Sequence, residues 1–175
     1  GTKVTDAGLE HLKGLTSLQT LNLSRTKITD AGLIHLKSMT KLQDLTLAAT
    51  TITGKGFVHL RGLPTLQTLS LEGCEKLGDQ LGVQLGQFSK LESLKLNHTN
   101  IRDQQLTGLG SLGQLTSLEL RVNSELTDAG LAHLKGLSRL KTLSVFFCPK
   151  ITGPGLQHLA TLEQLQTINL GNNPG

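Results

Sequence analysis

The sequence predicts an α/β solenoid, a right-handed coil with a parallel sheet of about seven short strands on its concave face and short helices on its convex face. One observation behind this prediction is a repeating frame, LxxLxxLxLxx(T/C/N) and then (I/L)TDxGLxxL, which covers nearly the whole chain. The other is that the two halves of the frame have different apolar periods. Apolar residues alternate in LxLxx, as in a half-buried strand, and recur at helical spacing in the second half. Since one strand and one helix cannot bury their own apolar faces, stacked repeats must share a core.

The frame divides the chain into complete and partial repeats within a single domain, residues 1–175. The chain begins part-way through a repeat, and no polar capping repeat follows the last strand. Solenoids need covered ends, so we expect a segment of a longer protein, or end-to-end self-association through the uncapped termini. The partial repeats are 1–14 and 162–175, and the complete ones are 15–38, 39–62, 63–87, 88–111, 112–136 and 137–161.

The helical half of each repeat carries its own start signal. In "ITDAGLIHLKS", Thr29 or Asp30 is expected to cap the first turn, and an acidic side chain favours the positive end of a helix. The repeat at 63–87 departs from the frame because Leu81 and Gly82 are exchanged. A local change in the helix or in the curvature is predicted there.

One position, directly after LxLxx, is expected to point inward and to bond to loop backbone from turn to turn. Where it holds Cys or Asn with a complete repeat following, the turn is one residue longer than where it holds Thr. Cys74 and Cys148 lie three turns apart, on the order of 14 Å, which is too far for a disulfide. They are predicted to be buried free thiols, which favours a reducing compartment such as the cytoplasm. The inward positions are Thr26, Thr50, Cys74, Thr99, Asn123, Cys148 and Asn173.

These motifs make the chain resemble the leucine-rich repeat proteins over essentially its whole length. The "TDAGLxHL" helix and the inward cysteines look like the cysteine-containing, ribonuclease-inhibitor-like class, as in F-box leucine-rich repeat receptors and in bacterial, planctomycete-like proteins. Thr at several of the Cys positions departs from that class. The resemblance implies a curved, horseshoe-shaped solenoid that binds other proteins.

Other functions find little support in the residues. The chain has no P-loop, GxSxG or GxGxxG after a buried strand, so we expect no enzyme and no cofactor. No apolar run approaches the roughly 20 residues that span a bilayer. Five histidines share one helix position, but helices on the outer arc lie roughly 8–10 Å apart, which argues against a metal site. The neighbouring basic residues, on a chain of net charge +4, are expected to form a solvated face, with nucleic-acid binding a less favoured reading. The histidines are His11, His35, His59, His133 and His158, and the basic residues are Lys13, Lys37, Arg61 and Lys135.

The predicted partner site lies on the later turns of the concave face, where the outward residues are charged, polar or aromatic instead of mostly small. Because Leu143 and Val145 point inward, Phe146 is expected to point out of the sheet, while Phe147 lies at the strand end and could tuck under its loop. The alternative is that both rings pack locally over Pro149 and Arg121, and that the chain is a structural spacer without a partner here. The residues predicted to bind a protein partner are Lys95, Asn97, His98, Glu119, Arg121, Val122, Phe146 and Phe147.

Overall fold

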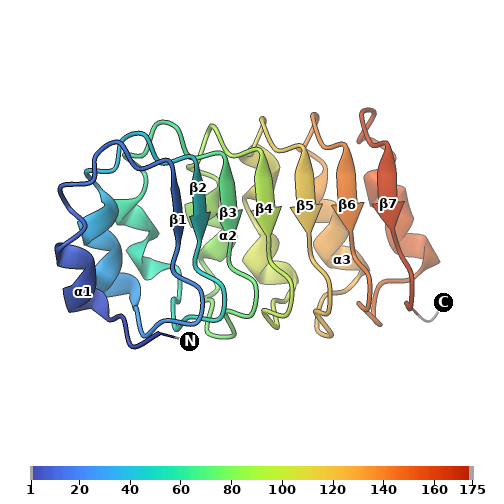
Figure 1. Cartoon of the computed structure of the whole chain (residues 1–175). Helices are drawn as coiled ribbons and strands as arrows, with labels where there is room; N and C mark the ends of the chain where they lie inside the picture. The colour runs from blue at the N-terminus through green and yellow to red at the C-terminus, as the bar shows by residue number, and fades with distance from the viewer. Residues whose placement is uncertain (1, 174–175) are drawn as a thin grey trace.

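The computed structural model describes residues 2–173 as a solenoid with one open parallel sheet. The strands follow the chain order across the sheet, each paired with the next (Figure 1). Helical segments pass behind the sheet and connect one strand to the next. The strands in the described residues are β1 (Thr20–Asn22), β2 (Asp44–Thr46), β3 (Thr68–Ser70), β4 (Ser93–Lys95), β5 (Ser117–Glu119), β6 (Thr142–Ser144) and β7 (Thr167–Asn169).

The helical segments are short, and most are 3₁₀ turns rather than α-helices. Each segment is only a few residues long. A 3₁₀ turn suits such a short segment because its hydrogen bond spans three residues, as where Gly32 N–H donates to Thr29 O at 3.1 Å. The α-helices are α1 (Asp6–Glu10), α2 (Leu81–Leu85) and α3 (Asp128–Leu131). The 3₁₀ segments are η1 (Asp30–Leu36), η2 (Lys55–His59), η3 (Asp103–Leu106), η4 (Leu109–Ser111), η5 (Ala132–Leu134) and η6 (Gly153–Leu159).

The core is built from columns of leucines that repeat from strand to strand. The register pairs Leu45 with Leu69 and Leu118 with Leu143, and all four side chains are fully buried. Val145 is fully buried as well, which confirms the inward register expected on either side of Ser144. Burial of one such side chain contributes roughly 1.5–3 kcal/mol. The repeated columns therefore supply most of the stability, and they leave the alternate residues free to face solvent.

The inward positions form the predicted backbone ladder. Thr50 Oγ1 donates to Leu47 O of its own turn at 2.7 Å, whereas Cys74 Sγ reaches the same carbonyl from the following turn at 3.1 Å. Cys148 Sγ likewise reaches Leu120 O of the preceding turn at 3.1 Å. Both cysteines are buried free thiols, and burial raises the pKa of each. The longer turns thus carry the side chains that reach across to the preceding turn.

Carboxylates join successive helical segments in a way that the capping rules did not predict. Thr29 Oγ1 accepts from Ala31 N–H within its own turn, but Asp30 acts on the next turn instead. Its carboxylate accepts from Thr53 N–H at 3.0 Å, Thr53 Oγ1 at 2.6 Å, and the N–H groups of Gly54 and Gly56. The same Asp-to-Thr contact recurs in three further places, Asp6 to Thr29, Asp103 to Thr127 and Asp128 to Thr152.

The irregular repeat has a different connection, as expected from the exchange of Leu81 and Gly82. Its helix α2 lies between the 3₁₀ segments η2 and η3, but α1 and α3 of regular repeats are α-helical as well, so the predicted change in helix type or curvature stays a prediction. In the next turn the buried side chain of Gln105 replaces the missing Asp–Thr contact. Its Oε1 accepts from Arg102 N–H at 2.7 Å, and its Nε2 donates to Leu77 O at 2.6 Å.

Candidate partner-binding surface

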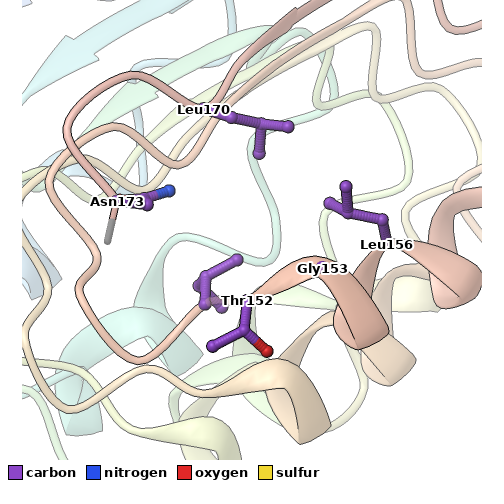
Figure 2. A pocket seen from close by; sticks show the side chains of 6 residues that line it. Thr152, Gly153, Leu156, Leu170 and Asn173 are labelled. Carbon is purple, nitrogen blue, oxygen red and sulfur yellow. The ribbon is translucent and has the colours of Figure 1, made fainter. Parts of the chain in front are cut away.

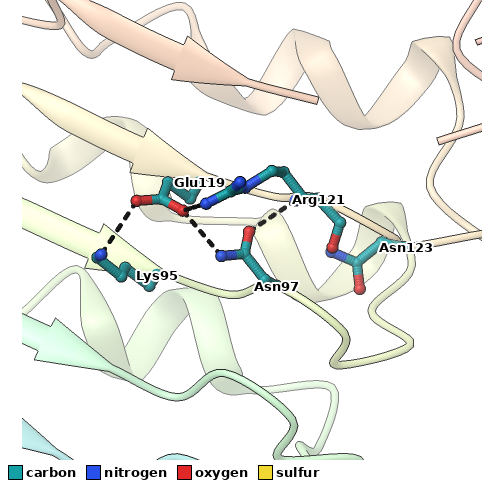
Figure 3. Close-up of polar contacts among 5 residues, drawn as sticks. All are labelled: Lys95, Asn97, Glu119, Arg121 and Asn123. Carbon is teal, nitrogen blue, oxygen red and sulfur yellow. Dashed lines mark hydrogen bonds and ion pairs between the residues drawn. The ribbon is translucent and has the colours of Figure 1, made fainter. Parts of the chain in front are cut away.

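A charged cluster lies on the solvent side of β4 and β5, which we call the sheet face. Lys95 Nζ is 3.2 Å from one oxygen of Glu119, and Arg121 pairs with the other oxygen (Figure 3). Asn97 Nδ2 donates to that second oxygen at 2.8 Å, while Asn97 Oδ1 accepts from the N–H of Arg121 at 2.9 Å. Asn97 is almost fully buried, so it positions the two charged side chains rather than presenting itself to a partner. The cluster is therefore a preorganised polar surface rather than a set of mobile surface charges.

The cluster perturbs the ionisation of Glu119. Partial burial raises the pKa of this carboxyl, but the hydrogen bonds from Asn97, Arg121 and Lys95 outweigh burial and lower the pKa to about 2. Glu119 therefore stays ionised through the whole physiological range, and Lys95 and Arg121 keep their partner. Both cations remain about two-fifths exposed, so they can still contact a bound molecule.

Titration of Glu119 is expected to have its midpoint near pH 2 instead of the ordinary value of 4.5. Since the folded-state pKa is depressed, the stabilisation from this carboxylate is present above the ordinary value and is lost as pH falls toward 2. Carboxyl carbon NMR of the wild type measures the midpoint directly. In Asn97→Ala the midpoint is expected to rise because one donor is removed. A wild-type midpoint close to 4.5 would contradict the described network.

The residue three positions after the end of each strand has a left-handed backbone. Val122 has a φ of 58° and Phe147 a φ of 56°, a region that costs roughly 1–2 kcal/mol for residues other than glycine. Glycine adopts it without that cost, and Gly73 occupies the same position with a φ of 70°. A β-branched and an aromatic residue are thus kept at a position where the fold would favour glycine. The other members of the series are Arg25, Ala49, His98 and Asn172.

The two phenylalanines form an exposed aromatic pair. Their ring centroids are 4.8 Å apart in an edge-to-face arrangement. Phe146 is half-buried on the sheet face, as its register predicted, and lies against Gly171 of the next turn. Phe147 is 50% exposed, so it does not tuck under its loop. One face of the pair therefore stays open to solvent.

A shallow hollow of about 220 Å³ brings most of the predicted residues together. Its lining does not include Lys95, Glu119 or Phe147. Glu119 nevertheless pairs with Arg121, which lines the hollow, and Lys95 pairs with Glu119. Glu72, which follows β3, lines the hollow and was missed, although it occupies the same outward position as Asn97 in the preceding turn. The lining residues are Glu72, Asn97, His98, Arg121, Val122 and Phe146.

A second hollow, of about 210 Å³, lies at the last turn between η6 and β7 (Figure 2). Leu156 and Leu170 point into it from the two sides, and Leu156 is 36% exposed. In the preceding turns the residues at the position of Leu156, such as Phe57 and Leu131, are fully buried. Gly153 stands where Asp128 stands one turn earlier, so this edge lacks the carboxylate that joins most other turns. End-to-end association through this edge remains a prediction.

The repeat frame, the continuous parallel sheet and the buried leucine columns are features of one protein family. The family model for the leucine rich repeat matches residues 16–75. The chain folds as a leucine-rich repeat solenoid. Its assignment to the cysteine-containing class stays a prediction.

Solved structures resemble the leucine-rich repeat chain over most of its length. Internalin C2 from Listeria monocytogenes is 26% identical, with a TM-score of 0.69 over 97% of this chain and 77% of that one. An internalin, inlF, from the same organism is 25% identical, with a TM-score of 0.62 over 99% of this chain and 59% of that one. A chain of the Rad7 and Elc1 complex in yeast is 21% identical, with a TM-score of 0.64, and shares the fold over 87% of this chain and 42% of that one.

A search of curated proteins found no match to the sequence. Within residues 2–173, no helix is long and apolar enough to cross a membrane, and no group of three or more His, Cys, Asp or Glu side chains is placed to hold a metal ion.

Proposed function

We propose that this single domain is a non-enzymatic protein-recognition module that binds a protein partner on its sheet face, the predicted concave face, at the turns from Lys95 to Phe147. Leucine-rich repeats generally serve protein–protein interaction. The outward residues of these turns are charged, polar or aromatic, whereas those of the earlier turns are mostly small. The observation that carries the proposal is the pair of half-buried Phe146 and exposed Phe147, with Phe146 lining the same hollow as Arg121, since aromatic and arginine side chains dominate binding energy at interfaces.

The arrangement supports binding better than it supports the alternatives. Glu119 holds Lys95 and Arg121 in fixed positions, so little side-chain entropy is lost when a partner binds. A structural spacer would gain nothing from a half-exposed aromatic ring at a strained backbone position. Nucleic-acid binding is less favoured because Glu119 pairs with both cations of the cluster and offsets one of their two charges, and because residues 2–173 hold no series of stacking aromatics.

The test is recovery of partners from a lysate of the source cell. A Phe146→Ser, Phe147→Ser double variant is expected to lose a protein that the wild type retains, because the aromatic anchors are removed. The matched control is Ala48→Ser, Ala49→Ser, which changes the equivalent positions four turns earlier and is expected to recover that protein as the wild type does. Circular dichroism checks that all three chains are folded. Equal recovery by all three would favour the spacer function.

A further inference from the structure

The helix side of the chain carries an apolar series that the sheet-face proposal does not use. One helix position holds Ile34, Val58 and Val83 in three successive turns. These side chains are 38%, 51% and 45% exposed. In the remaining turns the same position holds a charged, polar or small residue, namely Glu10, Thr107, Ala132 and Gln157.

The fold does not require aliphatic side chains at these positions. β-branched residues lose side-chain freedom in a helical turn, and an exposed side chain recovers little of that cost through burial. The segments η1, η2 and α2 that carry them pack against one another in order. The three side chains therefore lie at the same position on three adjoining segments, and we call this row the strip. Exposed apolar side chains that gather in one place, rather than scatter singly, are typical of interaction sites.

Cations flank this strip. Lys37 lies three residues after Ile34, while Lys55 and Arg61 lie three residues before and after Val58. Residues three apart on a helix are neighbours on its surface, which applies to Lys55 within η2. Lys37 caps the end of η1, and Arg61 follows the end of η2 by two residues. None of the three cations forms an ion pair within residues 2–173.

The nearby carboxylates are mostly engaged elsewhere. Asp30 is bonded into the next turn, and Glu10 pairs with Lys13 at 2.9 Å. Asp79, exposed two residues before α2, is the nearby acidic side chain that remains. The strip is thus apolar along its middle and carries excess positive charge at its sides.

We infer that Ile34, Val58, Val83, Lys37, Lys55 and Arg61 form a helix-face patch that binds an acidic amphipathic segment of another protein. Packed helical segments are spaced by roughly 8–10 Å. A partner helix lying across them brings a side chain to the same face every two turns, about 10.8 Å. Its apolar residues would lie on the strip, and its Asp or Glu residues would pair with the flanking cations. This surface is separate from the sheet face and does not depend on the function proposed there.

The test uses the whole chain and a fluorescein-labelled helical peptide of about 15 residues, long enough to cross three turns. The peptide has leucine at every seventh position and glutamate beside each leucine, and fluorescence polarisation measures its binding. Val58→Ser is expected to weaken binding about tenfold, because the central apolar contact is lost. Arg61→Glu is expected to weaken it at least as much through charge repulsion. Gln157→Ser, at the equivalent position outside the patch, is the control and is expected to leave binding unchanged.

Three outcomes would overturn the inference. One is equal binding of a peptide with lysine in place of glutamate, because the cations would then have no role. Another is unchanged binding by both Val58→Ser and Arg61→Glu. The last is failure to bind the acidic peptide while duplex DNA or phosphatidylserine vesicles bind in an Arg61-dependent manner, which would make the surface a general anion site.

Discussion

Replacing Asn123 by alanine is expected to lower the free energy of unfolding by about 4 kcal/mol, because several buried groups lose their partners at once. The Asn123 side chain is fully buried between two turns. Its Oδ1 accepts from Thr99 N–H and Thr99 Oγ1, both at 3.1 Å, and from Ile101 N–H at 3.3 Å. Its Nδ2 donates to Leu96 O at 2.9 Å and to Leu120 O at 2.8 Å. Urea unfolding followed by circular dichroism measures the change.

Two variants make this result specific to the amide. Asn123→Asp keeps the acceptor oxygen and loses the two donors, so it is also expected to destabilise the chain strongly. Gln157→Ala changes an exposed polar residue and is expected to stay within about 0.5 kcal/mol of the wild type. A loss below about 1 kcal/mol for Asn123→Ala would mean that the ladder of inward side chains does little to join the turns.

Replacing both Val122 and Phe147 by glycine is expected to abolish partner binding while leaving the fold as stable as the wild type, or more stable. Relief of the left-handed backbone favours the variant by roughly 1–2 kcal/mol per position. The greater freedom of glycine in the unfolded chain offsets about 0.4–1 kcal/mol of that. The loss of binding follows from removing the exposed side of the aromatic pair and one wall of the hollow. Thermal unfolding and partner recovery are measured on the same samples.

Ala49→Gly is the matched control, since Ala49 has a φ of 52° at the same position on the early turns. It is expected to show the same relief of strain and to keep the partner. Such a trade between stability and binding is a common property of functional surfaces. If the double glycine variant were strongly destabilised, Val122 and Phe147 would be structural residues, and the argument from backbone strain would be wrong.

The sheet and the core could be predicted from the sequence because their pattern is local and repeated many times. The alternation around Leu143 and Val145 was enough to place Phe146 on the sheet face. The inward ladder could be predicted because the residue type at Thr50 and Cys74 changes together with the turn length.

The contacts that pass between turns could not be predicted in the same way. Asp30 looks like an ordinary helix cap in the sequence, yet it bonds to Thr53, because the turns approach closely where Gly56 lacks a side chain. The burial of Asn97 and the role of Gln105 depend on partners more than 20 residues away in the chain. Glu72 was missed because the other outward residues of its turn are small, and only the folded arrangement places it in the same hollow as Arg121.

Site-specific photo-crosslinking tests the central claim most directly, because it reports where a partner lies on the surface. A photoreactive phenylalanine analogue is placed at Phe147 in one chain and at Ala49 in another, two positions with the same backbone conformation. If the later turns of the sheet face bind a protein, the analogue at Phe147 crosslinks one specific protein, and the analogue at Ala49 crosslinks much less of it. Equal crosslinking from both positions, or none from Phe147, would contradict the proposed site.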